Sequence, residues 1–161
     1  MKRKAQQRGV TLLEMMIVTA IIALVAGLSF PSAAAGVEQM RLRSTTDSVV
    51  GFLNTAIDRA QRRQQVVEVW IAPQDGVLTA RTPDLGFSRK LEIPAGFRIS
   101  EIRPALPNNQ VQPRRFLLYP GGTIPRIAIE IASATNENRR RYVSVDPFTG
   151  QPSAHAGRLR P

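Results

Sequence analysis

The pattern of hydrophobic and polar residues separates an apolar N-terminal part of the chain from a mixed C-terminal part. Residues 10–30 are mostly apolar, and Glu14 is the one charged residue among them. As a helix rising about 1.5 Å per residue, this stretch is about 30 Å long, the hydrocarbon thickness of a bilayer. A charge at the centre of a bilayer costs about 2.5–3.5 kcal/mol, and less near the end of a span. Glu14 therefore needs a compensating partner.

Further along, apolar residues recur at helical spacing. The positions are Leu42, Val49, Leu53, Ala56 and Ala60, with Phe52 and Ile57 beside them. Charged and polar residues occupy the other faces, which predicts a helix that packs on a sheet by one side. We expect one helix from about Thr11 to Gln64, apolar all round in its first half and amphipathic in its second half.

From residue 66 the pattern changes to short runs rich in β-branched and aromatic residues. The runs are Val66–Ala72, Val77–Arg81, Leu91–Ile93, Phe97–Ile102, Phe116–Tyr119, Ile127–Ile131 and Tyr142–Asp146. Turn residues such as Pro73–Gly76 separate them, and the Pro- and Asn-rich stretch Pro104–Arg115 reads as a loop. The predicted fold class is α+β: a long N-terminal helix, membrane-spanning in its first half, packed on a small antiparallel β-sheet domain.

Composition restricts the chemistry of the chain. There is no cysteine, and His155 is the only histidine. Thiolate metal sites, disulfides and a multi-histidine metal site within one chain are excluded. The carboxylates are scattered, and no pair is marked as acid and base by its context. We expect no enzyme activity, no cofactor and no metal site.

The charge is strongly positive and unevenly placed. The formal net charge is +10, and Lys2, Arg3, Lys4 and Arg8 lie ahead of the apolar run. By the positive-inside rule the basic head stays in the cytoplasm and the bulk of the chain lies outside. The N-terminal segment fits a secretory signal peptide loosely, with small residues at Ala33–Ala35, and it also fits a plain membrane anchor. Neither interpretation accounts for Glu14.

A third interpretation accounts for more of these residues. The segment resembles the type III signal of type IV prepilins and type II secretion pseudopilins, in which a basic leader ends in Gly and is followed by a hydrophobic residue, Thr, two aliphatic residues and Glu. Gly9 matches the end of the leader, Val10 the first mature residue, and Thr11–Glu14 follow in register. The family usually begins its mature chain with Phe, and this chain has Val10. Pro31 falls where pilins commonly carry a helix-kinking proline.

The resemblance implies a role for each of these positions. A prepilin peptidase cuts between Gly9 and Val10 and methylates the new amine of Val10. Glu14 pairs with the N-terminal amine of a neighbouring subunit in a filament, which supplies the missing compensation. Pro31 bends the helix as it leaves the membrane.

The C-terminal half resembles the GspH/FimT group of minor pilin-like subunits. The resemblance lies in the passage from the helix to Val66, in Phe116–Gly122, and in Val143–Gly150. It implies a minor pseudopilin of a type II secretion system, H class, which helps to move folded proteins across the outer membrane. Its implied partners are other pseudopilins or pilins, the prepilin peptidase and the inner-membrane assembly platform. Its implied location is the inner membrane, single-pass, with the C-terminal domain in the periplasm.

An alternative within the same group is a FimT-like minor type IV pilin that binds DNA for uptake. Gly157–Arg160 matches a G-R-x-R pattern near the end of such proteins, which makes Arg158 and Arg160 candidate DNA-binding residues, and Arg139–Arg141 could extend the basic patch. Arginines bind phosphates without reading sequence, so such binding would weaken steeply with salt.

These expectations divide the chain into five parts. They are a cleaved leader (1–9), a transmembrane and filament-core helix (10–31), its amphipathic continuation (32–65), a periplasmic β-sheet domain (66–150) and a flexible basic tail (151–161).

Overall fold

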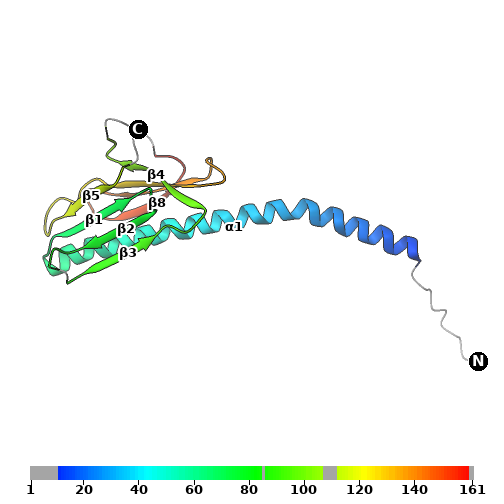
Figure 1. Ribbon diagram of the computed structural model, residues 1–161, viewed down its shortest axis with the longest axis horizontal. Helices are drawn as coiled ribbons and strands as arrows, with labels where there is room; N and C mark the ends of the chain where they lie inside the picture. The colour runs from blue at the N-terminus through cyan, green and yellow to red at the C-terminus, as the bar shows by residue number, and fades with distance from the viewer. Residues whose placement is uncertain (1–10, 85, 107–111, 160–161) are drawn as a thin grey trace, which may run out of the picture. The chain divides into compact units, whose positions relative to one another are not determined.

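The structure is a computed structural model that describes residues 11–84, 86–106 and 112–159, without the side chains of residues 28–33. The chain forms two compact units, residues 1–38 and 39–161. One helix, α1 (Leu12–Arg63), contributes to both units (Figure 1). The predicted helix from about Thr11 to Gln64 agrees with these bounds.

Both ends of α1 are closed by the chain's own polar groups. At the start, the backbone N–H of Glu14 donates a hydrogen bond to Oγ1 of Thr11 at 3.2 Å, so Thr11 is the N-cap. At the end, Gln64 has a φ of 51°, and the N–H of Gln65 donates to the carbonyl of Ala60 at 3.3 Å. This is the arrangement of a Schellman motif, in which a left-handed residue stops the helix.

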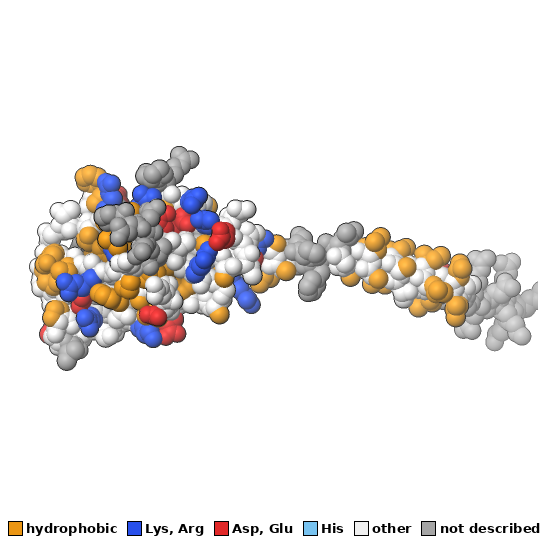
Figure 2. All heavy atoms as spheres, turned by 45° about the horizontal axis from the view of Figure 1, so that its top comes forward, with side chains coloured by type: hydrophobic (Ala, Val, Ile, Leu, Met, Phe, Trp, Pro, Cys, Tyr) orange, Lys and Arg blue, Asp and Glu red, His pale blue; other side chains and the backbone are white. Residues whose placement is uncertain are grey.

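The described residues of the first unit form helix alone. Their apolar side chains are exposed, as in Leu12 at 80% and Met16 at 63%. Figure 2 shows hydrophobic side chains along this part of the helix. Across the residues described, no helix combines the length and the apolar character that crossing a membrane requires.

The second unit contains two four-stranded antiparallel sheets. Sheet A has the strand order β3-β2-β1-β5 and sheet B the order β4-β6-β7-β8. The strands are β1 (Val67–Ala72), β2 (Val77–Arg81), β3 (Ser88–Glu92), β4 (Phe97–Arg103), β5 (Arg114–Leu118), β6 (Ala128–Ser133), β7 (Arg140–Val145) and β8 (Pro152–Ala156).

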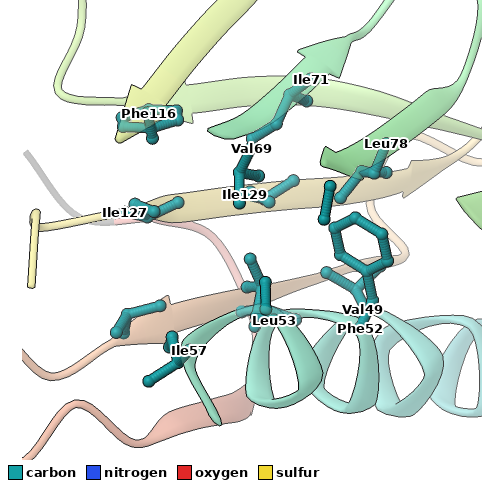
Figure 3. Close-up of a cluster of buried hydrophobic side chains, with 14 of the residues drawn as sticks. Val49, Phe52, Leu53, Ile57, Val69, Ile71, Leu78, Phe116, Ile127 and Ile129 are labelled. Carbon is teal, nitrogen blue, oxygen red and sulfur yellow. The ribbon is translucent and has the colours of Figure 1, made fainter. Parts of the chain in front are cut away.

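The core forms where the amphipathic half of α1 meets the inner faces of both sheets. Val49, Phe52, Leu53 and Ile57 of α1 are buried together with residues of β1, β2, β6 and β7. Figure 3 shows these helix side chains pointing toward the strands of the two sheets. The helical stripe predicted from the sequence is the buried stripe, and its interior positions recur at three- and four-residue spacing. The predicted α+β class, with a long helix packed on antiparallel β-structure, is thereby confirmed.

The sheet arrangement differs from the expectation of one sheet that ends near residue 150. Residues 152–156, expected within a flexible tail, form β8 along β7, with Val145 opposite Pro152 and Arg141 opposite Ala156. The sequence PSAHA contains few large apolar residues and does not by itself predict a strand. It forms a strand because it pairs with β7, and not because its own side chains are buried.

The turn between β7 and β8 is tightly built. Gly150 has a φ of 72°, and a Cβ at this position would lie 2.4 Å from Cδ1 of Ile124. The N–H of Phe148 donates to Oδ1 of Asp146 at 2.8 Å, and the N–H of Gly150 donates to the Asp146 carbonyl at 2.7 Å. These bonds set the direction in which the chain returns as β8.

Candidate functional site

The start of α1 places Glu14 in the first helical turn, at the third position after the N-cap. Thr11 and Glu14 are spaced as in a capping box, although the structure gives only one of its two bonds, from the Glu14 N–H to Thr11. A carboxylate in the first turn is stabilised by the helix dipole by about 0.3–1 kcal/mol. The T-x-x-E spacing of Thr11 and Glu14 is the sequence signal from which this cap could have been predicted. Part of the compensation that Glu14 requires is therefore local.

The other predicted N-terminal positions are only partly covered by the structure. Gly9 and Val10 lie outside the described residues, so cleavage between them and methylation of Val10 remain predictions. Pro31 lies within α1, which is helical on both sides of it, and its side chain is outside the description. A kink at Pro31 remains a prediction.

The helix around Glu14 presents apolar side chains in every direction. Ten large apolar residues between Leu12 and Val25 are at least 43% exposed, and they are Leu12, Leu13, Met15, Met16, Ile17, Val18, Ile21, Ile22, Leu24 and Val25. Removing apolar surface from water is worth about 25 cal/mol per Å². An exposed surface of this kind marks a place that lipid or protein covers.

A second candidate site is a groove on sheet B, which we call the arginine groove. It encloses about 550 Å³, and the residues that line it include Gln74, Arg98, Ser100, Glu137, Arg140 and Arg158. Arg98 of β4 and Arg140 of β7 both lie opposite Ala132 of β6, so the two arginines extend from the same face of the sheet. Arg158 follows β8 and is exposed. Arg160 lies outside the described residues.

A buried carboxylate supports this groove from below. Glu130 of β6 is 1% exposed and faces three donors. Ser100 Oγ lies 2.8 Å and Arg140 Nη1 3.2 Å from its Oε1, and the backbone N–H of Leu159 donates to Oε2 at 2.9 Å. The segment after β8, expected to be flexible, is therefore bonded to the sheet. Removing the partner of a buried charge costs about 3–5 kcal/mol, because the charge is left without compensation in the protein interior.

Sequence reasoning missed this network because its geometry depends on two irregular features. The register of β4 against β6 shifts between Ile99 and Glu101, which turns Ser100 toward Glu130. In the sequence Glu130 is the polar member of an alternating strand, and such residues usually face solvent. The segment beyond β8 covers it instead, and nothing in the local sequence signals that return.

Glu137, in the β6–β7 turn, brings a second carboxylate to the groove. Arg98 donates a hydrogen bond to Oε1 of Glu137, and Arg140 Nη2 lies 3.9 Å from Oε2. Figure 2 shows acidic and basic side chains next to one another at several places on this unit. Among the described residues, Arg158 is the arginine of the groove that pairs with no carboxylate.

The arginines of the predicted basic patch Arg139–Arg141 do not share one surface, because neighbouring side chains of a strand point to opposite faces of the sheet. Arg140 points into the arginine groove, whereas Arg141 donates from Nε to Oγ1 of the buried Thr46 on α1 at 3.2 Å. Neighbouring residues of a strand face opposite sides of the sheet, so the two arginines cannot serve one surface.

Comparison with known proteins supports the N-terminal assignment. Residues 4–30 match the family model described as the prokaryotic N-terminal methylation motif. No curated protein sequence matches the chain.

Comparison with solved structures supports the fold. The structure of the minor pseudopilin EpsH from the Type 2 Secretion System of Vibrio cholerae superposes with a TM-score of 0.56 at 14% identity, covering 72% of this chain and 97% of that chain. The chain thus combines the N-terminal motif of prepilin-like proteins with a type IV pilin-like fold, as the sequence resemblance predicted.

Proposed function

We propose that this chain is a minor pseudopilin of a type II secretion system, H class, and a structural subunit of the periplasmic pseudopilus. The observation that carries the proposal is the combination of a methylation motif over residues 4–30 with a domain whose fold resembles that of a minor pseudopilin. In this role the chain helps to move folded proteins across the outer membrane.

The proposed path begins in the inner membrane. Residues 10–31 insert as a single-pass helix with the basic head in the cytoplasm and residues 66–150 in the periplasm. The exposed apolar side chains from Leu12 to Val25 support this step, because lipid and then neighbouring helices would cover them. The prepilin peptidase removes residues 1–9 and methylates Val10, and the assembly platform moves the subunit into the filament.

Glu14 has a specific part in that assembly. Its carboxylate stands in the first helical turn, and Glu14 follows Val10 by four residues. The Glu14 carboxylate of one subunit and the Val10 amine of a neighbour would therefore lie at similar depth in the membrane, where they can form a salt bridge. The helix dipole compensates the negative charge of Glu14 only in part, and pairing with the N-terminal amine of a neighbouring subunit supplies the rest.

Deletion of the gene in its own host tests this proposal. We expect secreted proteins to accumulate, folded, in the periplasm, and DNA uptake to stay at its wild-type rate. The control is restoration by the intact gene on a plasmid. Normal secretion together with a loss of DNA uptake would contradict the proposal and favour the alternative.

That alternative is the FimT-like minor type IV pilin that binds DNA. The observation in its favour is that Arg158, one of the two predicted DNA-binding residues, lines a groove with Arg98 and Arg140. Against it, Glu130 and Glu137 already pair with Arg140 and Arg98, which reduces the positive charge offered to a polyanion.

A further inference from the structure

The arginine groove has features of a binding site beyond those that the fold requires. An arginine on a strand can turn into solvent, where an isolated ion pair is worth about 0–1 kcal/mol. Here three arginines from β4, β7 and the segment after β8 line one hollow of about 550 Å³. A volume of this size matches a few amino-acid residues or a small ligand.

The walls of the groove are held in position from the protein interior. The buried carboxylate of Glu130 binds the guanidinium of Arg140 through one oxygen and the backbone of Leu159 through the other. The second bond fixes the chain next to Arg158. One buried group thus positions two walls, and sites with such support are pre-organised for a ligand.

The groove already holds one carboxylate. Glu137 is exposed, with 67% of its side chain accessible, and it reaches back from the β6–β7 turn to Arg98 and Arg140. It shows that these two guanidinium groups accept a carboxylate carried on a peptide chain. Arg158 offers a third guanidinium, which no carboxylate of the described chain satisfies.

We infer that the arginine groove binds a carboxylate-bearing segment of a partner protein, and that Glu137 occupies part of the site until that segment replaces it. Arginine binds carboxylates through paired N–H donors, and Ser100 and Gln74 add polar groups to the wall. A nucleic acid is disfavoured, because Glu137 and Glu130 place negative charge where a phosphate backbone would lie. The inference rests on the proposed function only in taking the partner to be a protein met during assembly or secretion.

The test measures binding to the purified full chain in a non-ionic detergent at low ionic strength. The probes are a labelled oligoglutamate peptide and, separately, a thymidine oligonucleotide of equal charge. We expect the peptide to bind and to bind more tightly than the oligonucleotide. We expect Arg158→Ala to weaken peptide binding about tenfold, since it removes one charge-assisted contact.

Two further variants distinguish binding in the arginine groove from non-specific attraction of the peptide to the positive charge of the protein. Arg126→Ala removes an exposed arginine two residues before β6, at the opposite end of that strand from Ala132, and should change affinity less than about twofold. Glu137→Gln removes the competing carboxylate and should tighten binding about two- to fivefold, the range of an exposed ion pair.

Three outcomes would overturn the inference. They are no peptide binding by the wild-type chain, an equal loss in Arg126→Ala and Arg158→Ala, and tighter binding of the oligonucleotide than of the peptide. Weaker peptide binding by Glu137→Gln would likewise contradict the part assigned to Glu137. Peptide binding is measured on the isolated chain, whereas the proposed function is tested by secretion in the deletion strain. A failure of peptide binding would therefore contradict the inference about the groove without contradicting the proposed function.

Discussion

Single residues in this protein act mainly by holding turns and termini in place. Glu130 does so from the interior and Asp146 from the surface. The hydrogen bond from the backbone N–H of Phe148 lowers the pKa of the Asp146 carboxyl below its ordinary value of 3.8. The charged form of Asp146 is therefore favoured in the folded state over the unfolded state.

This difference predicts how stability responds to acid. A carboxyl whose pKa is depressed on folding contributes stability above its unfolded pKa, and that contribution disappears as the pH falls through the folded pKa. We expect the full chain to lose stability as the pH drops below about 3.8, and Asp146→Asn, which keeps an acceptor oxygen for Phe148, to lose less over the same range. Chemical denaturation followed by the fluorescence of Trp70, the single tryptophan, measures this.

Asp47→Asn is the matched control for the Asp146 variant. Asp47 is exposed on α1, and no hydrogen bond from a backbone N–H to its side-chain carboxylate is seen in the described part of the chain. If both variants changed the acid response equally, the hydrogen bond from Phe148 would not be the cause.

At the scale of elements, the end of α1 carries a conformational cost. Gln64 has a φ of 51°, where a side chain is disfavoured by about 1–2 kcal/mol relative to glycine. Glycine costs about 0.5–1 kcal/mol more entropy on folding, so Gln64→Gly should stabilise the unit by about 0.5–1 kcal/mol. The same fluorescence-detected denaturation in non-ionic detergent gives the free energy of unfolding.

Gln61→Gly makes the same substitution three residues earlier, inside the helix. There glycine should destabilise by about 1 kcal/mol. Two variants that differ only in position should therefore move in opposite directions. A loss of stability in both would mean that relief of the left-handed backbone at residue 64 does not offset the entropy of glycine.

At the scale of the whole molecule, the chain joins an apolar helical unit to a folded domain with its own core. Only the first unit carries Glu14, and the large apolar side chains from Leu12 to Val25 that surround it along the helix are exposed. We expect Glu14→Ala to be cleaved after Gly9 like the wild type, yet to be absent from filaments assembled with the host's other pseudopilins. Mass spectrometry reports cleavage, and immunoblots of sheared filaments report incorporation.

Thr11→Ala separates the two roles of this helix start. It removes the N-cap, at a cost of about 0.5–2 kcal/mol to the helix, and leaves the carboxylate in place. If Glu14 acts by pairing with a neighbouring amine, Thr11→Ala should still enter filaments. Incorporation of Glu14→Ala at the wild-type level would refute the pairing role.

The sequence by itself determined the features that depend on local pattern. Four features could be predicted from the sequence alone. They are the apolar run, the helical stripe from Leu42 to Ala60, the turn residues, and the register of Gly9, Val10 and Glu14. These features could be predicted because helix periodicity and turn formation depend on residues only a few positions apart. The α+β class was predicted from these patterns, and the pilin-like fold from the resemblance to prepilin-like proteins.

Only the tertiary structure decided how the strands divide into two sheets and which charges meet. β8 is a strand because β7 lies beside it. Glu130 is buried because Arg140, on the neighbouring strand, and Leu159, 29 residues further along the chain, cover it. Arg98, Arg140 and Arg158 lie on different segments and share one groove through the pairing of β4, β6, β7 and β8. Such contacts depend on non-local pairing and on a register shift, and neither leaves a periodic signal in the chain.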